Sequence, residues 1–243
     1  PRPTRYAIAV AATDNRRRWR DIACNNAAMD AYDGLLGLIR SGELTGDTKV
    51  SESSLANRLG MSRTPVREAL RVLDAQSLVV SRGRGVCVRV PGTRELREAF
   101  ETRCALEGYA AQRAAEAHHA GLLLPARLRE VEYLAERCDE VTRTQGPSAG
   151  AEANRHFHLA TAALAGNRQI DALLAVVWDQ IAIASRAGLT AHPRMNAVHD
   201  EHEDILCAIR DGNPERARIA ATRHIDQTQH LAEQGHETQE ELR

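Results

Sequence analysis

The chain has 243 residues, 43% of them hydrophobic and 27% charged, which excludes wholesale disorder. No uncharged apolar run approaches about 18 residues, which excludes a membrane-spanning helix. The net charge of −1 hides an asymmetry: six basic and two acidic residues in 1–25, nine and seven in 26–92, and seventeen and twenty-four in 93–243. A cationic amino-terminal part on an acidic remainder indicates that one piece meets a polyanion.

The amino-terminal third predicts an extension followed by helices. Residues 1–25 show no sustained periodicity and carry a cluster of four arginines, which suits either a solvated segment or an auxiliary phosphate-binding arm. From residue 26, apolar residues recur at intervals of three and four and predict a helix that ends at Ser41-Gly42. A second, short helix is expected after Ser51, ending at a tight turn at Gly60.

A third helix and a hairpin complete this region. Ser62 is a good N-cap residue, and Pro65 falls in the first turn, where its missing N–H has no intrahelical partner anyway. The run Leu78-Val79-Val80, a Ser-Arg-Gly-Arg-Gly turn and the alternating Val86, Val88 and Val90 predict a β-hairpin. Pro91-Gly92 is the expected domain boundary.

The rest of the chain predicts helices alone. The expected ranges are 94–119, 125–144, 150–165, 168–187, 195–211 and 214–235. We therefore expect a mainly α protein: an extension (1–25), a winged helix-turn-helix of three helices and a β-hairpin wing (26–92), and an all-α bundle of six or seven helices (93–243).

The third helix and the hairpin tip carry the candidate DNA-binding residues. Arg63, Arg67 and Arg71 lie within about 80° of arc beside the apolar face of the helix. Arginine can grip guanine or clamp a phosphate, and glycine lets a backbone approach a groove edge. The alternative is a solvated arginine face on a core helix. The expected contacts are Ser62, Arg63, Thr64, Arg67, Arg82, Gly83 and Arg84.

Three strings of the amino-terminal part resemble the GntR family of bacterial transcription regulators. They are Leu38-Ile39-Arg40-Ser41-Gly42-Glu43-Leu44, Ser51-Glu52-Ser53-Ser54-Leu55-Ala56, and Leu59-Gly60-Met61-Ser62-Arg63-Thr64-Pro65-Val66-Arg67-Glu68-Ala69-Leu70. The resemblance implies that Ser62, Arg63, Thr64 and Arg67 contact DNA from the recognition helix. Many members place Arg where this chain has Ser53, so one contact there is in doubt.

Four side chains of the bundle are candidates for a metal site. Asn154 and His158 are four residues apart on one helix face, and His202 and His224 lie on the last two long helices. Three imidazoles plus one oxygen donor suit zinc or nickel. Any one of these histidines alone is better explained as a satisfied or exposed residue, and His199 is a rival ligand.

The same region resembles the FCD effector domain of the FadR-type branch of GntR regulators. The matching strings are Asn154-Arg155-His156-Phe157-His158, Ala165-Gly166-Asn167, His202-Glu203-Asp204-Ile205-Leu206-Cys207-Ala208-Ile209 with Gly212-Asn213, and His224. The resemblance implies a divalent metal held by Asn154, His158, His202 and His224. Asn154 stands where members usually have Asp, and an amide brings no charge, so we expect weaker affinity or a changed preference.

Arg103 is the candidate effector-binding residue. The resemblance implies that it faces the effector cavity, where its guanidinium suits a small carboxylate. The alternative is an ordinary ion pair with Glu107, four residues on, at a helix surface.

The function expected from the sequence is a ligand-responsive, DNA-binding transcription regulator. It would act as a homodimer on a short inverted repeat of duplex DNA, without a membrane role. Five cysteines without a C-x-x-C pair fit a reducing cytoplasm. The sequence contains no nucleophile elbow, phosphate loop or H-E-x-x-H motif, so these patterns give no indication of an enzyme. The alternatives are a bundle that binds metal or a small acid without a DNA role, or a metalloenzyme built on Glu116-x-x-His119 and Glu233-x-x-His236.

Overall fold

The computed structural model describes residues 26–83, 85–186 and 195–241. The chain divides into two compact units, and the division falls between Gly92 and Thr93. We call residues 26–92 the winged unit and the described residues from 93 onward the bundle. The expected extension, residues 1–25, lies outside the described residues. Within the described ranges, no helix is both long and apolar enough to cross a membrane.

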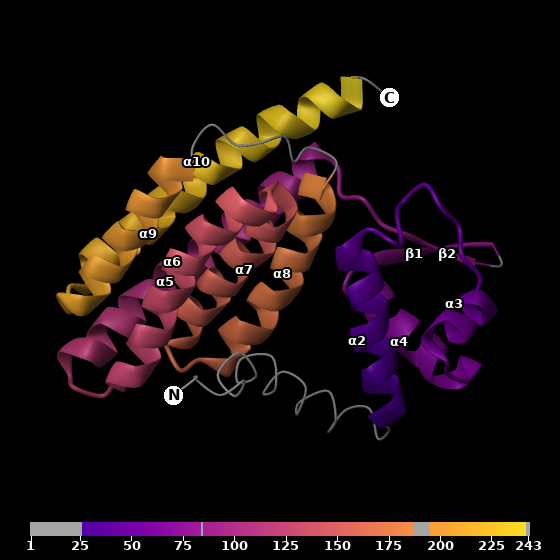
Figure 1. Ribbon diagram of the computed structural model, residues 1–243, viewed down its shortest axis with the longest axis horizontal. Helices are drawn as coiled ribbons and strands as arrows, with labels where there is room; N and C mark the ends of the chain where they lie inside the picture. Colours follow the sequence, from indigo (N-terminus) through magenta and orange to yellow (C-terminus); the bar gives the residue numbers. More distant parts are fainter. Residues whose placement is uncertain (1–25, 84, 187–194, 242–243) are drawn as a thin grey trace. The chain divides into compact units, whose positions relative to one another are not determined.

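The winged unit contains three helices and a two-stranded sheet (Figure 1). Its elements are α2 (Asn26–Ser41), α3 (Glu52–Leu59), α4 (Arg63–Ala75), β1 (Val79–Arg82) and β2 (Gly85–Val88). The strands pair antiparallel with Arg82 opposite Gly85, and Val50 forms an isolated bridge with Val86. The segment before α3 is thereby held against the hairpin, and the expected winged helix-turn-helix is confirmed.

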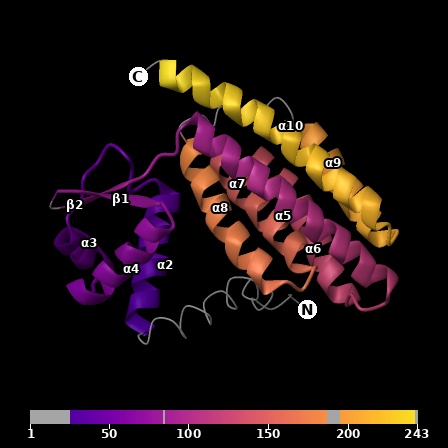
Figure 2. The same cartoon turned by 180° about the vertical axis from the view of Figure 1, so that it is seen from behind.

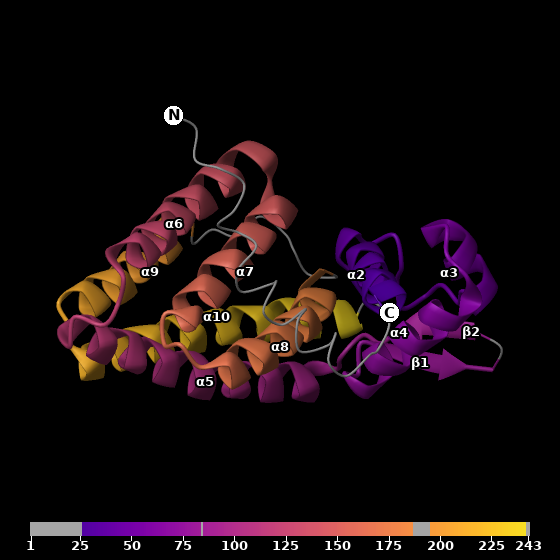
Figure 3. The ribbon, with the colours of Figure 1, turned by 90° about the horizontal axis from the view of Figure 1, so that it is seen from below.

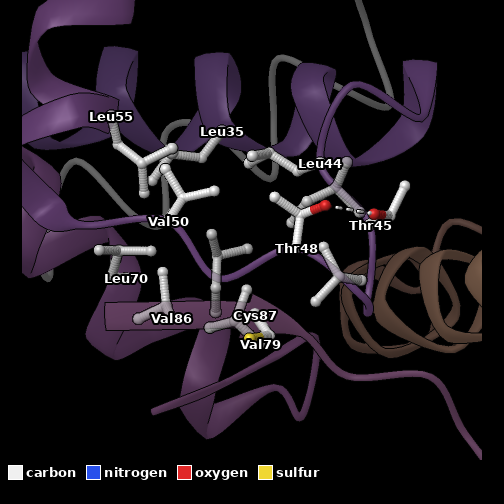
Figure 4. Close-up of a pocket in the computed structure, with 13 residues that line it drawn as sticks. Leu35, Leu44, Thr45, Thr48, Val50, Leu55, Leu70, Val79, Val86 and Cys87 are labelled. Carbon is white, nitrogen blue, oxygen red and sulfur yellow. Dashed lines mark hydrogen bonds between the residues drawn. The ribbon is translucent and has the colours of Figure 1, made fainter. Parts of the chain in front are cut away.

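A small apolar cavity marks the centre of the winged unit's core (Figure 4). Leu35 of α2, Leu55 of α3 and Leu73 of α4 meet there with no exposed surface. Burying a leucine of this kind stabilises a fold by about 1.5–3 kcal/mol. The spacing of three and four along α2 and α4 therefore serves to bring one apolar face of each helix to this core.

The turn between α3 and α4 depends on local capping. Ser51 caps α3 by accepting a hydrogen bond from the Ser54 backbone N–H at 3.2 Å. Gly60 ends α3 in the left-handed region with φ 63°, which a glycine adopts without strain. Ser62 occupies the N-cap position of α4, where it is exposed and its side chain makes no capping hydrogen bond.

The bundle contains six helices within the described residues (Figures 1 and 2). They are α5 (Thr93–His119), α6 (Pro125–Gln145), α7 (Pro147–Ala163), α8 (Arg168–Arg186), α9 (Met195–Arg210) and α10 (Pro214–Glu241). The expected helical bundle is confirmed. Most helix ends lie within two residues of expectation. The larger differences are that α7 begins three residues early, because Pro147 fits the first turn after Gly146, and that α10 continues through Gly235.

The two longest helices, α5 and α10, lie side by side in the bundle (Figure 2). Gly108 of α5 permits this approach, since a Cβ there would lie 2.7 Å from Cγ2 of Thr222 on α10. The α6–α7 pair and α9 complete the packing, as seen from below in Figure 3. This arrangement brings α5, α7, α8, α9 and α10 around one buried polar cluster.

Candidate nucleic-acid interface and metal centre

The amino-terminal end of α4 presents the predicted recognition residues to solvent. Arg63, Thr64 and Arg67 are exposed, with 64% of the Arg63 side chain and 47% of the Arg67 side chain accessible. Val66 and Leu70 are buried on the opposite side of the helix. The structure therefore separates the basic face of α4 from its core face, as the sequence periodicity indicates.

Glu52 in the first turn of α3 pairs with both of these arginines. Its Oε2 accepts a hydrogen bond from Nε of Arg67 at 3.0 Å and lies 3.8 Å from Nη2 of Arg63. Exposed ion pairs of this kind contribute about 1 kcal/mol or less, so a DNA phosphate or base can displace the carboxylate. The sequence analysis missed Glu52, because its partners lie on the next helix.

The hairpin tip carries the remaining predicted DNA contacts. Arg82 and Gly83 are exposed, Gly83 has a φ of 59°, and Arg84 lies outside the described residues. Lys49, in the segment bridged to β2, also reaches this tip: a Cβ on Gly83 would lie 3.5 Å from its Nζ. Lys49 is a cation at the wing that the sequence analysis missed, because only the bridge between Val50 and Val86 brings its loop there.

Three predicted histidines converge inside the bundle. His158 of α7, His202 of α9 and His224 of α10 are at most 3% exposed, and each offers a ring nitrogen within 4.8 Å of the others. We call these three residues the histidine cluster. The rival His199 is exposed, and His156 is 42% exposed and pairs with Glu152.

Two carboxylates orient the rings of the histidine cluster. Nδ1 of His158 lies 2.8 Å from Oε2 of Glu107, and Nδ1 of His224 lies 2.7 Å from Oε2 of Glu201. A carboxylate can only accept, so each Nδ1 atom is the donor, and in a neutral ring Nε2 then presents a lone pair. Carboxylate-anchored imidazoles of this kind are typical of metal-binding histidines.

The free ring nitrogens fit a shared cation. Nε2 of His158 and Nε2 of His224 face each other at 3.1 Å, so with both rings neutral their lone pairs would point at a common position that a cation can occupy. Nε2 of His202 is buried without a hydrogen-bond partner among the described residues. The donor set is therefore chemically suited to zinc or nickel.

The predicted fourth ligand, Asn154, lies one turn before His158 on α7. Its amide oxygen accepts a long hydrogen bond, 3.9 Å, from the Cys138 thiol on α6. Its role as a metal ligand stays a prediction.

Arg103 and Glu107 form a buried ion pair beside the histidine cluster. Nε of Arg103 donates to Oε1 of Glu107 at 2.8 Å, and the two side chains are 1% and 6% exposed. The alternative of an ordinary helix-surface pair is therefore wrong. The guanidinium carbon of Arg103 lies 3.8 Å from the centroid of Trp178, and its Nη2 is buried without a partner in the described part of the chain.

Burial and charge set the protonation states of the cluster. Desolvation lowers the pKa of His158 to about 4 and that of His202 well below its usual value. Burial alone would raise the pKa of Glu107, but the Arg103 guanidinium and His158 outweigh it and hold that pKa below its ordinary range. Neutral imidazoles beside an anionic carboxylate are the states that metal binding requires.

Comparison with known proteins identifies the family. The family model for bacterial regulatory proteins of the gntR family matches residues 27–88, and that for the FCD domain matches residues 98–227. The chain belongs to the GntR family of transcriptional regulators. The FCD match covers the histidine cluster and the Arg103–Glu107 pair, and FCD domains of GntR regulators can bind metal.

Named relatives and a solved structure agree with this GntR assignment. The chain is 32% identical over 202 residues to a probable D-xylose utilization operon transcriptional repressor of Paenarthrobacter nicotinovorans, covering 82% of this chain and 85% of that protein. It is 30% identical to the Uxu operon regulator of Haemophilus influenzae, covering 74% and 72%. The fold is similar to that of E. coli McbR/YncC, with a TM-score of 0.74, 22% identity and coverage of 86% and 98%.

GntR regulators are not enzymes, so the metalloenzyme alternative is discarded. The acidic residues of its two motifs also have other partners. Glu116 contacts Arg113 on the same helix, and Glu233 accepts a hydrogen bond from Nε of Arg97 at 2.9 Å.

The contacts that support the histidine cluster in this GntR regulator were missed in the sequence. Glu107 was noted only as a possible partner of Arg103, and Glu201 and Trp178 were not noted, yet these three residues contact the cluster or its neighbours from three helices. One signal was available: the chain has two Phe and two Trp, and Phe157 stacks on His202 with ring centroids 4.0 Å apart. In a chain so poor in aromatics, a Phe next to a candidate ligand indicates a built site.

Proposed function

We propose that this GntR regulator reads its operator with the amino-terminal end of α4 and with the wing. Arg63 and Arg67 would contact base edges in the major groove, while Ser62 and Thr64 contact phosphates near the helix terminus. Arg82, Gly83 and Arg84 would approach the backbone or minor groove from the wing. The observation that supports this is the exposed basic face of α4, opposite its buried apolar face.

A second copy of the chain would complete the reading unit. One helix and one wing contact too few base pairs for operator choice, so we propose a homodimer on a short inverted repeat that mirrors its two-fold axis. We place this activity in the bacterial cytoplasm, where the DNA is found.

The test of the DNA interface is Arg67→Ala, with Arg58→Ala as the matched control. Arg58 is also an exposed arginine of the winged unit and pairs with Glu43 of the same unit. We expect Arg67→Ala to lose about 1–3 kcal/mol of preference for operator over random DNA, and Arg58→Ala to keep that preference. Equal loss in both variants would show that charge alone, and not Arg67, carries the effect.

We propose that the bundle holds a divalent metal, zinc or nickel, on the histidine cluster. The single observation that carries this is the convergence of three buried imidazoles, two of them anchored by carboxylates through Nδ1. The bound ion would supply positive charge and open coordination positions. We further propose Asn154 as an additional oxygen ligand.

Arg103 is proposed to bind the effector, a small carboxylate. Its Nη2 is buried without a partner in the described residues, so it is a donor ready for an anion. Effector binding changes DNA affinity only if the effector prefers one arrangement of the two DNA-reading units over the other.

The metal proposal is tested by metal analysis of chelator-stripped protein reconstituted with zinc. We expect close to one zinc per chain in the wild type, a large loss in His202→Ala, and no loss in His156→Ala, which removes an exposed histidine two residues from His158. Equal zinc content in all three would assign the metal to other ligands.

A further inference from the structure

Glu107 connects the histidine cluster to Arg103 through one carboxylate. Oε1 accepts hydrogen bonds from Nε of Arg103 at 2.8 Å and from Nε1 of Trp178 at 3.0 Å. Oε2 accepts from Nδ1 of His158 at 2.8 Å. The side chain is 6% exposed, so these groups, from α5, α7 and α8, are its immediate environment. One acidic group therefore serves both proposed binding sites.

The charges of this region do not favour an anion by themselves. Arg103 contributes one positive charge, Glu107 cancels it, and Glu201 adds a negative charge next to His224. Nε2 of His158 and Nε2 of His224 face each other at 3.1 Å, a distance that disfavours a proton on both nitrogens. A carboxylate entering beside Arg103 would thus be buried without net positive charge to compensate it, which is costly in a region shielded from water. A divalent cation on the histidine cluster supplies two positive charges and reverses this balance.

We propose that Glu107 is a positioning residue that makes carboxylate binding at Arg103 conditional on the metal. It neutralises Arg103 when the histidine cluster is metal-free and orients His158 when a metal is bound. The proposal rests on the proposed function, because it needs both the metal and the carboxylate site.

The hydrogen bonds of Glu107 account for the coupling. A cation at Nε2 of His158 would withdraw electron density from the ring and make its Nδ1–H a stronger hydrogen-bond donor. Glu107 would then bind more strongly to His158 and less strongly to Arg103. The guanidinium of Arg103 would then be less neutralised by Glu107, and its Nη2 could donate to a carboxylate. Linkage requires the reverse as well: a carboxylate bound at Arg103 must raise metal affinity by the same factor.

The experiment measures zinc affinity of the full chain by competition with a chromogenic chelator, with and without acetate at constant ionic strength. Chloride replaces acetate in the reference. In the wild type we expect acetate to tighten zinc binding by roughly fivefold or more, within the usual range of site coupling. Metal-free wild type should show no acetate-induced shift in melting temperature, and zinc-loaded wild type should show one.

Glu107→Gln keeps the size of the side chain and removes its charge. We expect this variant to bind zinc about tenfold to a hundredfold more weakly, to lose the acetate effect on zinc, and to respond to acetate without metal. Glu116→Gln is the matched control on the same helix, since it removes a part-exposed carboxylate paired with Arg113, and should behave as the wild type.

Each result decides between the proposals. Zinc binding without any effect of acetate, or the same coupling in Glu107→Gln as in the wild type, would overturn the role of Glu107 and leave the metal site standing. Acetate binding equally well to metal-free wild type would also overturn it, and needs no variant to fold. Failure of the wild type to bind zinc at all would overturn the metal site itself, and the role of Glu107 with it.

Discussion

The winged unit and the bundle treat charged side chains in opposite ways. In the described residues, every buried polar or charged side chain belongs to the bundle, whereas the winged unit buries apolar residues and keeps the arginines of α4 exposed. Glu52 holds Arg67 in an exposed pair, while Glu107 holds Arg103 in a buried one. The two units thus use the same carboxylate–guanidinium chemistry at different depths.

Depth decides what each pair can do. An exposed pair is weak and screened by salt, so at the proposed interface a DNA phosphate would replace the carboxylate. A buried pair is costly to separate and remains coupled to its neighbours. The surface pair suits a polyanion that competes for arginines, and the buried pair suits a small ligand whose binding must depend on a second site.

The largest effect is expected from breaking the buried pair. Arg103→Met leaves Glu107 buried without its cation, which should destabilise the bundle by about 3–5 kcal/mol. Arg113→Met removes one partner of the part-exposed pair with Glu116 and should cost about 1 kcal/mol or less. Urea denaturation of both variants measures the difference. Similar costs would show that burial does not distinguish the two pairs.

The stability of the metal-free bundle should fall as the pH is lowered from about 6.5 toward 4. Burial lowers the pKa of folded His158 to about 4 from the unfolded value near 6.5, so in this window the unfolded chain binds more protons. Glu107, whose pKa is held low in the fold, adds a further loss below about pH 4.5.

Tryptophan fluorescence of a Trp19→Phe variant would follow this bundle transition, since Trp178 is then the only tryptophan. His156→Asn, which removes an exposed histidine, should keep the same profile. A melting temperature that is flat between pH 6.5 and 4 would contradict the burial of neutral His158.

The smallest effect is expected at the wing. Lys49→Gln should weaken operator and random DNA alike and lower the slope of log affinity against log salt by about one, as expected for one lost phosphate contact. Arg137→Gln, at an exposed position of the bundle, should leave the slope unchanged. Because Lys49 is the only lysine, amine-reactive labelling with and without operator gives a second measurement. An unchanged slope with undiminished labelling would remove Lys49 from the interface.

The sequence predicted the winged unit well because its determinants are local. The helix face of Val66, Leu70 and Leu73, the glycine turn at Gly60 and the hairpin all depend on residues close in sequence. The roles of Glu52 and Lys49 were missed because they depend on contacts between elements. Glu52 of α3 pairs with Arg67 of α4, and the bridge between Val50 and Val86 brings the loop of Lys49 to the wing.

The bundle site could be predicted only in part. Three of the expected ligands converge, but spacing along one helix says nothing of which helices face each other. Glu107 and His158 are 51 residues apart, and His158 and His224 are 66 apart. The spacing of Arg103 and Glu107 left a surface pair open as an alternative, because an i, i+4 spacing is the same whether the helix face is exposed or buried.

The most direct test of the metal centre is a crystal structure of the zinc-reconstituted protein with anomalous data collected at the zinc edge. The account predicts one strong peak per chain, about 2.0–2.1 Å from a ring nitrogen of each of His158, His202 and His224. A peak at His156 or His199, with the three buried rings contacting only their carboxylates and one another, would contradict it.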